Sequence, residues 1–194
     1  MLEGTPVVRG GFLPQEAGAW VRNFSDELGH RRVIDRAVVG RLVGVYPERV
    51  EWESPDARAW WALFCEDELP AVEPSGPVTR RRDDQGIELW TQIELGALHA
   101  AWDLAIDRRD GRLRARCLEA TRWHVGELQP DNATAHAWAL HGFAICAEEC
   151  GLEEAWVHAE MLLHACMVGM GRPDRFSACL MLDAARTLRS DLER

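Results

Sequence analysis

The chain has 194 residues, a net charge of −10 and a hydrophobic fraction of 47%. A chain of this size folds as one globular domain that buries roughly 70% of its unfolded surface, and its hydrophobicity excludes intrinsic disorder. The acidic balance argues against a nucleic-acid partner, because affinity for phosphates comes from basic side chains. All 22 basic residues are arginine, so no lysine can form a Schiff base or complete a P-loop.

The start of the chain and its cysteines indicate a cellular compartment. Residues 1–5 show neither the basic nor the apolar region of a signal peptide, and no stretch of 18 apolar residues occurs. The six cysteines form no Cys-x-x-Cys pair. This usage is typical of cytosolic proteins with free, buried thiols. We therefore expect a cytoplasmic protein without a membrane partner.

Residues 1–69 are predicted to form helices at the N-terminal end of a single helical domain that covers 1–194. The first helix covers about 14–28, between a proline and a glycine. Residues 31–46 fit a strand or a helix, and the spacing of their apolar residues favours a helix. A third helix begins at Ser54-Pro55-Asp56, where a capping residue, a proline and an acid follow one another, and it ends before Pro70.

Residues 70–86 interrupt the helical pattern. They contain three prolines, two glycines and the run Arg80-Arg81-Arg82. A loop of this length inside a compact domain is usually a lid, a binding segment or disordered. We expect it to be flexible and to contribute nothing to the core.

The rest of the chain, 87–194, reads as a run of five helices with short connections. Short connections make neighbouring helices antiparallel. The motif Ala97-Leu98-His99-Ala100 recurs as Ala139-Leu140-His141-Gly142, and a period near 40 residues is typical of stacked helical hairpins. We expect an all-α fold of about eight helices, arranged as an array or a partial α/α toroid. The five predicted helices are 87–107, 112–127, 132–149, 153–169 and 174–191.

The stretch from Glu127 to Thr134 gathers a carboxylate, amides and a hydroxyl at a turn between two helices. One interpretation is a polar catalytic site, in which a histidine is the general base and Asp131 or Glu127 is its acid or its orienting partner. The other is a proline stop followed by a capping residue, with histidines that pack singly. The candidate residues are His124, Asp131, Asn132, His136 and His141.

A metal site is a weaker hypothesis. Cys146 and Cys150 lie four residues apart on one helical face, and with His164 or Cys166 they could bind zinc. Free cysteines also pack as small hydrophobic residues. We expect neither a metal nor a cofactor.

The aromatic residues are unusual, because the chain has nine tryptophans and one tyrosine. Five of the tryptophans are spread over four consecutive predicted helices. Core packing explains most of them, and a ligand cavity lined by aromatic rings is the alternative. These five are Trp90, Trp102, Trp123, Trp138 and Trp156.

The helices from Ile87 onward resemble those of α/α-toroid proteins, the group that includes terpenoid cyclases and six-hairpin glycosidases. More narrowly, Gln129–Thr134, Trp138–His141, Leu163-His164 and Gly171–Asp174 are similar to segments of uncharacterised bacterial helical proteins. This resemblance covers about the last 105 residues. It implies a fold and no activity, since the aspartate-rich motif of the cyclases is missing.

We therefore expect a cytosolic helical protein that binds a small molecule or another protein. The alternative is a small hydrolase or lyase that works in a groove near 124–141. We also expect a homodimer through the last helix, 174–191, because its apolar face is too broad to leave in water. That face carries Phe176, Cys179, Leu180, Leu182 and Leu188.

Overall fold

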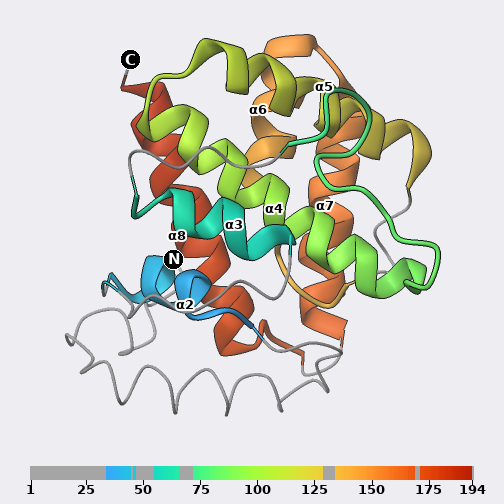
Figure 1. The fold of residues 1–194 in the computed structure, drawn as a ribbon. Coiled ribbons are helices and arrows are strands. Elements are labelled where there is room, and N and C mark those ends of the chain that lie inside the picture. The colour runs from blue at the N-terminus through green and yellow to red at the C-terminus, as the bar shows by residue number, and fades with distance from the viewer. Residues whose placement is uncertain are drawn as a thin grey trace.

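The computed structural model describes residues 34–44, 46, 55–65, 72–128, 134–168 and 171–193. Within these ranges every regular element is a helix and there is no strand, so the all-α prediction of helical hairpins is confirmed (Figure 1). The predicted helix at 14–28 lies outside the described residues. The described helices are α2 (Arg36–Val43), α3 (Pro55–Ala62), α4 (Ile87–Asp107), α5 (Gly111–Glu127), α6 (Leu140–Cys150), α7 (Glu153–Val168) and α8 (Arg175–Leu192).

Helix α4 is the centre of the fold and runs diagonally across the molecule in Figure 1. It contacts α3, α5, α6 and α8, and every residue from Trp90 to Ile106 is buried. A helix that is apolar on all sides belongs in the middle of a domain. Its few charged residues must therefore find partners inside the protein. The largest fully buried side chains of the core are Trp60, Trp61, Trp102, Trp138, Phe143 and Phe176.

The helix ends follow local sequence signals. The carboxylates of Asp35, Asp110 and Asp174 each accept a hydrogen bond from a backbone N–H in the first turn of the following helix. These are N-caps, which are worth about 1 kcal/mol each. Gly151 ends α6 in the left-handed conformation, with φ of 60°. The helix predicted within 31–46 is confirmed as α2.

The predicted helix 132–149 is wrong in its first half, since α6 begins only at Leu140. The backbone N–H of Ala139 instead donates to Nδ1 of His99 at 3.1 Å, and Ala139 has a φ of 54°. The hydroxyl of Thr134 accepts from the N–H of His136 at 3.0 Å. These bonds compete with helix formation, and the non-helical segment 134–139 carries Trp138 into the core.

The two copies of the sequence repeat do not occupy equivalent places. Residues 97–100 lie in the middle of α4, whereas residues 139–142 span the start of α6. The two tetrapeptides therefore have different structural roles despite their similar sequences. His99 and His141, the histidines of the two copies, lie against each other with ring centroids 4.4 Å apart.

Helix α8 does not present the apolar face that motivated the dimer. Phe176, Cys179 and Leu180 are buried within the chain, where α8 packs against α2, α4 and α6. The homodimer stays a prediction, but the apolar residues of α8 no longer support it. Exposed apolar side chains gather instead on α7, at Trp156, Val157, Leu163, Met167 and Val168.

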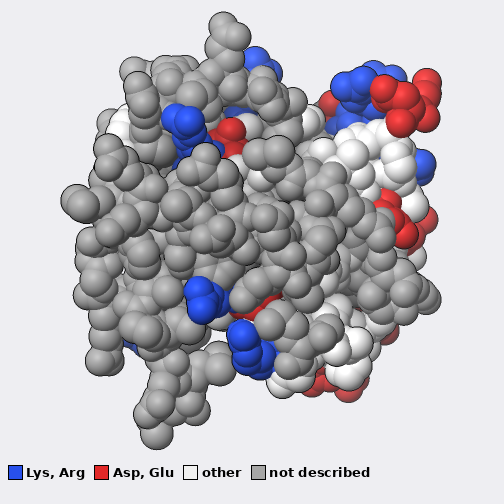
Figure 2. Space-filling model, turned by 90° about the horizontal axis from the view of Figure 1, so that it is seen from below, with Lys and Arg blue, Asp and Glu red and all other residues white. Residues whose placement is uncertain are grey.

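None of the described helices is long and apolar enough to cross a membrane. On the face shown in Figure 2, the described basic and acidic side chains are intermixed and form no single broad basic patch.

Candidate functional site

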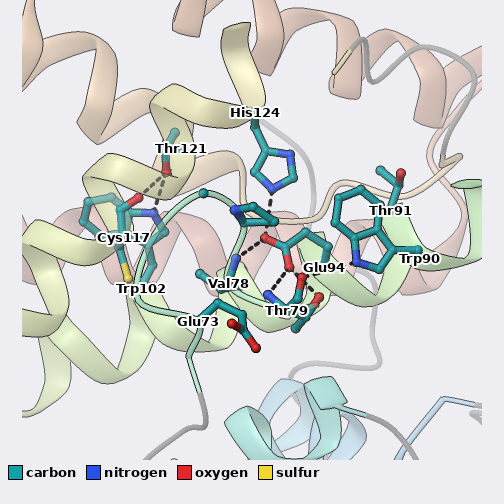
Figure 3. Close-up of polar contacts among 12 residues, drawn as sticks. Glu73, Val78, Thr79, Trp90, Thr91, Glu94, Trp102, Cys117, Thr121 and His124 are labelled. Atoms are coloured by element: carbon teal, nitrogen blue, oxygen red, sulfur yellow. Dashed lines mark hydrogen bonds and ion pairs between the residues drawn. The ribbon is translucent and has the colours of Figure 1, made fainter. Parts of the chain in front are cut away.

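A buried carboxylate on α4, that of Glu94, binds the loop 72–86. It accepts hydrogen bonds from the backbone N–H of Val78 at 2.6 Å and of Thr79 at 2.5 Å, and from the Thr79 hydroxyl at 2.5 Å (Figure 3). On its other side, Nε2 of His124 lies 3.1 Å from Oε1. A fully buried carboxylate requires such a set of donors, so Glu94 fixes both the loop and the histidine.

An arginine on α5 holds the same loop from the other side. The guanidinium of Arg116 donates to the carbonyls of Glu73, Gly76 and Pro77 at 2.7 to 2.8 Å. Val78 is only 1% exposed and belongs to the core. The expectation that 70–86 adds nothing to the core is therefore wrong for Val78, because two distant helices supply partners for the loop backbone.

A groove of about 510 Å³ lies between this loop and the facing parts of α4 and α5. In it the rings of Trp90 and Trp123 pack edge to face, with centroids 6.1 Å apart at 83°. The volume is within the range of small-molecule sites, which are mostly apolar with a few polar groups. We call it the tryptophan groove, and it is lined by Glu73, Ser75, Pro77, Arg80, Arg81, Ile87, Trp90, Trp123, Glu127 and Leu128.

Two of the residues singled out from the sequence belong to this region. Glu127 lines the tryptophan groove. His124 is buried behind it, with its ring 5.2 Å from Trp123 and 6.4 Å from Phe143. His124 thus has a carboxylate partner, although that partner is Glu94 and not Asp131 or Glu127.

His136 has a different environment. Its Nδ1 lies 3.0 Å from the hydroxyl of Ser177 and 3.2 Å from Oδ2 of Asp174. A catalytic serine–histidine–aspartate triad uses the two ring nitrogens for two different partners, and here both partners meet one nitrogen. The arrangement fastens the segment before α6 to the start of α8, so a structural role accounts for it.

His141 belongs to a third group, a buried polar centre between α4, α6 and α8. Its Nε2 lies 3.4 Å from Oδ1 of Asp103, and neither of its ring nitrogens makes a hydrogen bond with a described residue. Ligand atoms of His99, Asp103 and His141 all lie within 4.8 Å of one another, a spacing that suits a metal ion. This spacing occurs at no other group of three His, Cys, Asp or Glu residues in the described part of the chain.

Arg41 of α2 joins this polar centre to the surface. Its guanidinium lies 3.3 Å from Asp103, 3.0 Å from Asp107 and 3.6 Å from Asp183. Next to it is a cavity of about 170 Å³, lined by Arg41, Asp107, Asp183, Arg186, Thr187 and Ser190. The polar centre, defined as Arg41, His99, Asp103, His141 and Asp183, therefore has a path to solvent.

The pKa values of the two aspartates in the polar centre are shifted in opposite directions. Burial raises the pKa of Asp103 well above its usual value, and the nearby charge of Asp183 raises it further. Burial acts against ionisation of Asp183 too, but the nearby Nε2 of His99, 3.6 Å away, and the charge of Arg41 outweigh it and lower its pKa. Burial lowers the pKa of both histidines, so His99 and His141 are neutral at pH 7.

The three described histidines of the predicted site are therefore not brought into one cleft. His124, His136 and His141 contact three different carboxylates, on Glu94, Asp174 and Asp103. Asp131 and Asn132 lie outside the described residues. The structure instead assembles residues that the sequence analysis did not single out. The only available signal was two acids, Glu94 and Asp103, inside an otherwise apolar helix.

The described residues do not form the predicted zinc site at Cys146 and Cys150. Cys146 and Cys150 belong to a small apolar cluster, where the Sγ of Cys150 lies 2.9 Å from the guanidinium of Arg122. His164 is exposed on α7, and Cys166 is buried and donates to the carbonyl of Leu162. No set of three ligands forms there.

His158 supplies a pH-dependent prediction. It is buried and stacked on Phe143, and burial together with His124 lowers its pKa to about 4. In the unfolded chain His158 binds a proton below about pH 6.5, whereas in the folded protein it stays neutral down to about pH 4. The free energy of unfolding therefore falls as the pH decreases. Between pH 6.5 and pH 4 the loss from this group should reach roughly 3 kcal/mol.

Urea unfolding of the wild type and of His158→Gln at several pH values measures this effect. The variant should lose stability less steeply in the acid range, whereas His164→Gln, at an exposed position, should follow the wild type. Equal slopes for wild type and His158→Gln would mean that His158 titrates normally.

Comparison with protein-family models, with curated proteins and with solved structures found no match.

Proposed function

We propose that the protein is a helical binding protein whose ligand site is the tryptophan groove. The supporting observation is a concave site of about 510 Å³ built around an edge-to-face tryptophan pair. One wall of the groove is a loop whose backbone is fixed by Glu94 and Arg116. A wall fixed before binding lowers the ordering entropy that a ligand must overcome.

The ligand chemistry follows from the lining. The lining combines apolar side chains, such as those of Ile87, Trp90 and Trp123, with charged residues of both signs. Arg80 and Arg81 are opposite in charge to Glu73 and Glu127. Arg80 makes no ion pair with any described residue, so its guanidinium is available to a carboxylate. We propose a ligand with an apolar ring or side chain and with one anionic and one cationic group, as in an amino acid or short peptide.

Isothermal titration calorimetry with a matched pair of peptides tests this proposal. The dipeptide Phe-Leu with free termini should bind, and the same dipeptide acetylated and amidated should bind at least tenfold more weakly because it has lost both charges. The variant Trp123→Ala should weaken the binding of the free dipeptide at least tenfold, since an aromatic contact and its buried area are lost.

The control for this experiment is Trp156→Ala, because Trp156 is an exposed tryptophan on α7 outside the groove. It should bind the dipeptide as the wild type does. The double variant Arg80→Gln with Arg81→Gln changes only exposed loop residues and should reduce the preference for free termini, since it removes the partners of the ligand carboxylate. Equal affinities of the two peptides for the wild type, or no binding of either at millimolar concentration, would contradict the proposal.

The alternative, a small hydrolase or lyase near 124–141, has one observation in its favour. The buried Glu94 carboxylate orients the ring of His124 next to the tryptophan groove, as a carboxylate orients a general base. The same calorimetry samples, analysed by mass spectrometry after overnight incubation, distinguish the two functions. Binding without cleavage supports the binding protein, and cleavage that His124→Gln abolishes supports the enzyme.

A further inference from the structure

Helix α7 has an exposed apolar side opposite the side that packs into the protein. It packs mainly against α6 and α5, and its buried side includes His158, which stacks on Phe143 of α6. Five large apolar side chains on the other side are between 40% and 68% exposed. Apolar surface gathered in this way marks an interaction site. We call this side the α7 face, and it consists of Trp156, Val157, Glu160, Leu163, His164, Met167 and Val168.

The spacing of these residues is that of a seam between two helices. Steps of four, three and four residues separate the successive positions Trp156, Glu160, Leu163 and Met167. Alternating steps of three and four keep side chains on one line along a helix that packs against another helix. Helix α7 has 16 residues, so the face is roughly 24 Å long. A partner that covers it must offer an apolar helix of similar length, and a second α7 is such a helix.

The charges at the two ends of α7 select the direction of the partner helix. Glu153 and Glu154 are exposed in its first turn, and Arg172 is exposed just beyond its last turn. None of these three residues makes an ion pair with a described residue, and Arg172 donates only to the carbonyl of Pro173. A second α7 in the parallel direction would bring the two acidic ends together. An antiparallel one brings the acidic end of each copy to Arg172 of the other, where opposite charges attract.

We propose that the protein forms a homodimer in which the α7 faces of two copies pack antiparallel about a two-fold axis. Each contact then occurs twice, because the same surface of both copies takes part. With the axis at the level of Leu162, Glu160 of each copy lies opposite His164 of the other, and an imidazole N–H can donate to the carboxylate. The two polar residues of the face thus satisfy each other, and the apolar residues on either side of them cover one another.

This dimer should be in reversible equilibrium with the monomer. A single helix pair makes an interface at the small end of specific interfaces, where association is weak, so we expect a Kd on the order of 10 µM. The α7 face shares no residue with the tryptophan groove, so the two proposals fail or hold independently.

Sedimentation velocity of the full chain between about 1 and about 500 µM tests the dimer. The wild type should change from monomer to dimer over this range. Leu163→Glu and Met167→Glu each place a charge in the apolar seam and should weaken association at least tenfold. Circular dichroism checks that these variants, changed at exposed positions, are folded.

Leu192→Glu is the control, because Leu192 is an exposed apolar residue on α8, away from the α7 face. It should associate as the wild type does. A wild type that stays monomeric at the highest concentration, or a Leu192→Glu variant that loses association as Leu163→Glu does, would overturn the proposal.

Charge reversal tests the antiparallel direction. One variant carries Glu153→Arg and Glu154→Arg, and the other carries Arg172→Glu. Each variant alone should dimerise at least threefold more weakly at low salt, since like charges meet at both ends of the seam. An equimolar mixture of the two variants should recover the association of the wild type, because opposite charges then meet at both ends. A mixture that associates as weakly as the separate variants would contradict the antiparallel arrangement.

Discussion

Replacing Glu94 with alanine should lower the free energy of unfolding by about 4 kcal/mol, as expected when one partner of a buried charged network is removed. The substitution leaves the N–H groups of Val78 and Thr79 without their acceptor and leaves His124 without its carboxylate. The loop 72–86 then loses its attachment to α4. Urea unfolding at pH 7, followed by circular dichroism, measures the change.

Two further variants show whether the charge or the shape of Glu94 matters. Glu94→Gln keeps the shape but replaces one acceptor oxygen with a donor, so about half of the loss should remain. Glu148→Ala on α6 removes an exposed carboxylate and should change stability by less than about 0.5 kcal/mol. A Glu94→Ala variant as stable as Glu148→Ala would show that the loop is not held by Glu94.

The substitution Gly142→Ala should lower the free energy of unfolding by about 3 kcal/mol, a value typical of overpacking in a core. A Cβ at Gly142 would overlap Nε1 and Cδ1 of the Trp102 indole. Trp102 cannot move away easily, because it is fully buried and its Nε1 donates to the hydroxyl of Thr121 at 3.1 Å. Thermal and urea unfolding both measure the loss.

Gly126→Ala is the matched control, since a Cβ at this position of α5 meets no atom within 4 Å. Alanine is the better helix former, so the control should be as stable as the wild type or more stable. In a double-mutant cycle, Trp102→Phe should reduce the loss caused by Gly142→Ala, because the smaller ring leaves room for the methyl group. Strictly additive losses would show that the two residues do not collide.

Local signals in the sequence were sufficient to predict most helices, and they failed where a distant partner decides the conformation. Asp174 and Gly151 are a cap and a stop that act within their own turns, so the start of α8 and the end of α6 follow from them. Residues 134–139 have a helical pattern, yet His99 on α4 binds the N–H of Ala139 and the segment is not helical. A hydrogen bond across 40 residues leaves no periodic signal.

The candidate site shows the same limit. His124 and Glu127 were identified from a polar turn, but the contacts that surround them come from Glu94 and from the loop 72–86. In the polar centre, Arg41, Asp103 and Asp183 are far apart in sequence, and only the packing of α2, α4 and α8 brings them together. What the sequence does contain is an acid in the middle of an apolar helix, and both Glu94 and Asp103 fit that description.

The most direct test of the ligand site is a two-dimensional NMR titration that follows the indole N–H signals of the nine tryptophans. Variants Trp90→Phe and Trp123→Phe assign the two signals of the tryptophan groove. Addition of Phe-Leu with free termini should shift these two signals in a saturable manner and leave the signal of Trp156 in place. Unchanged signals for Trp90 and Trp123, or equal shifts at Trp156, would contradict the groove as the binding site.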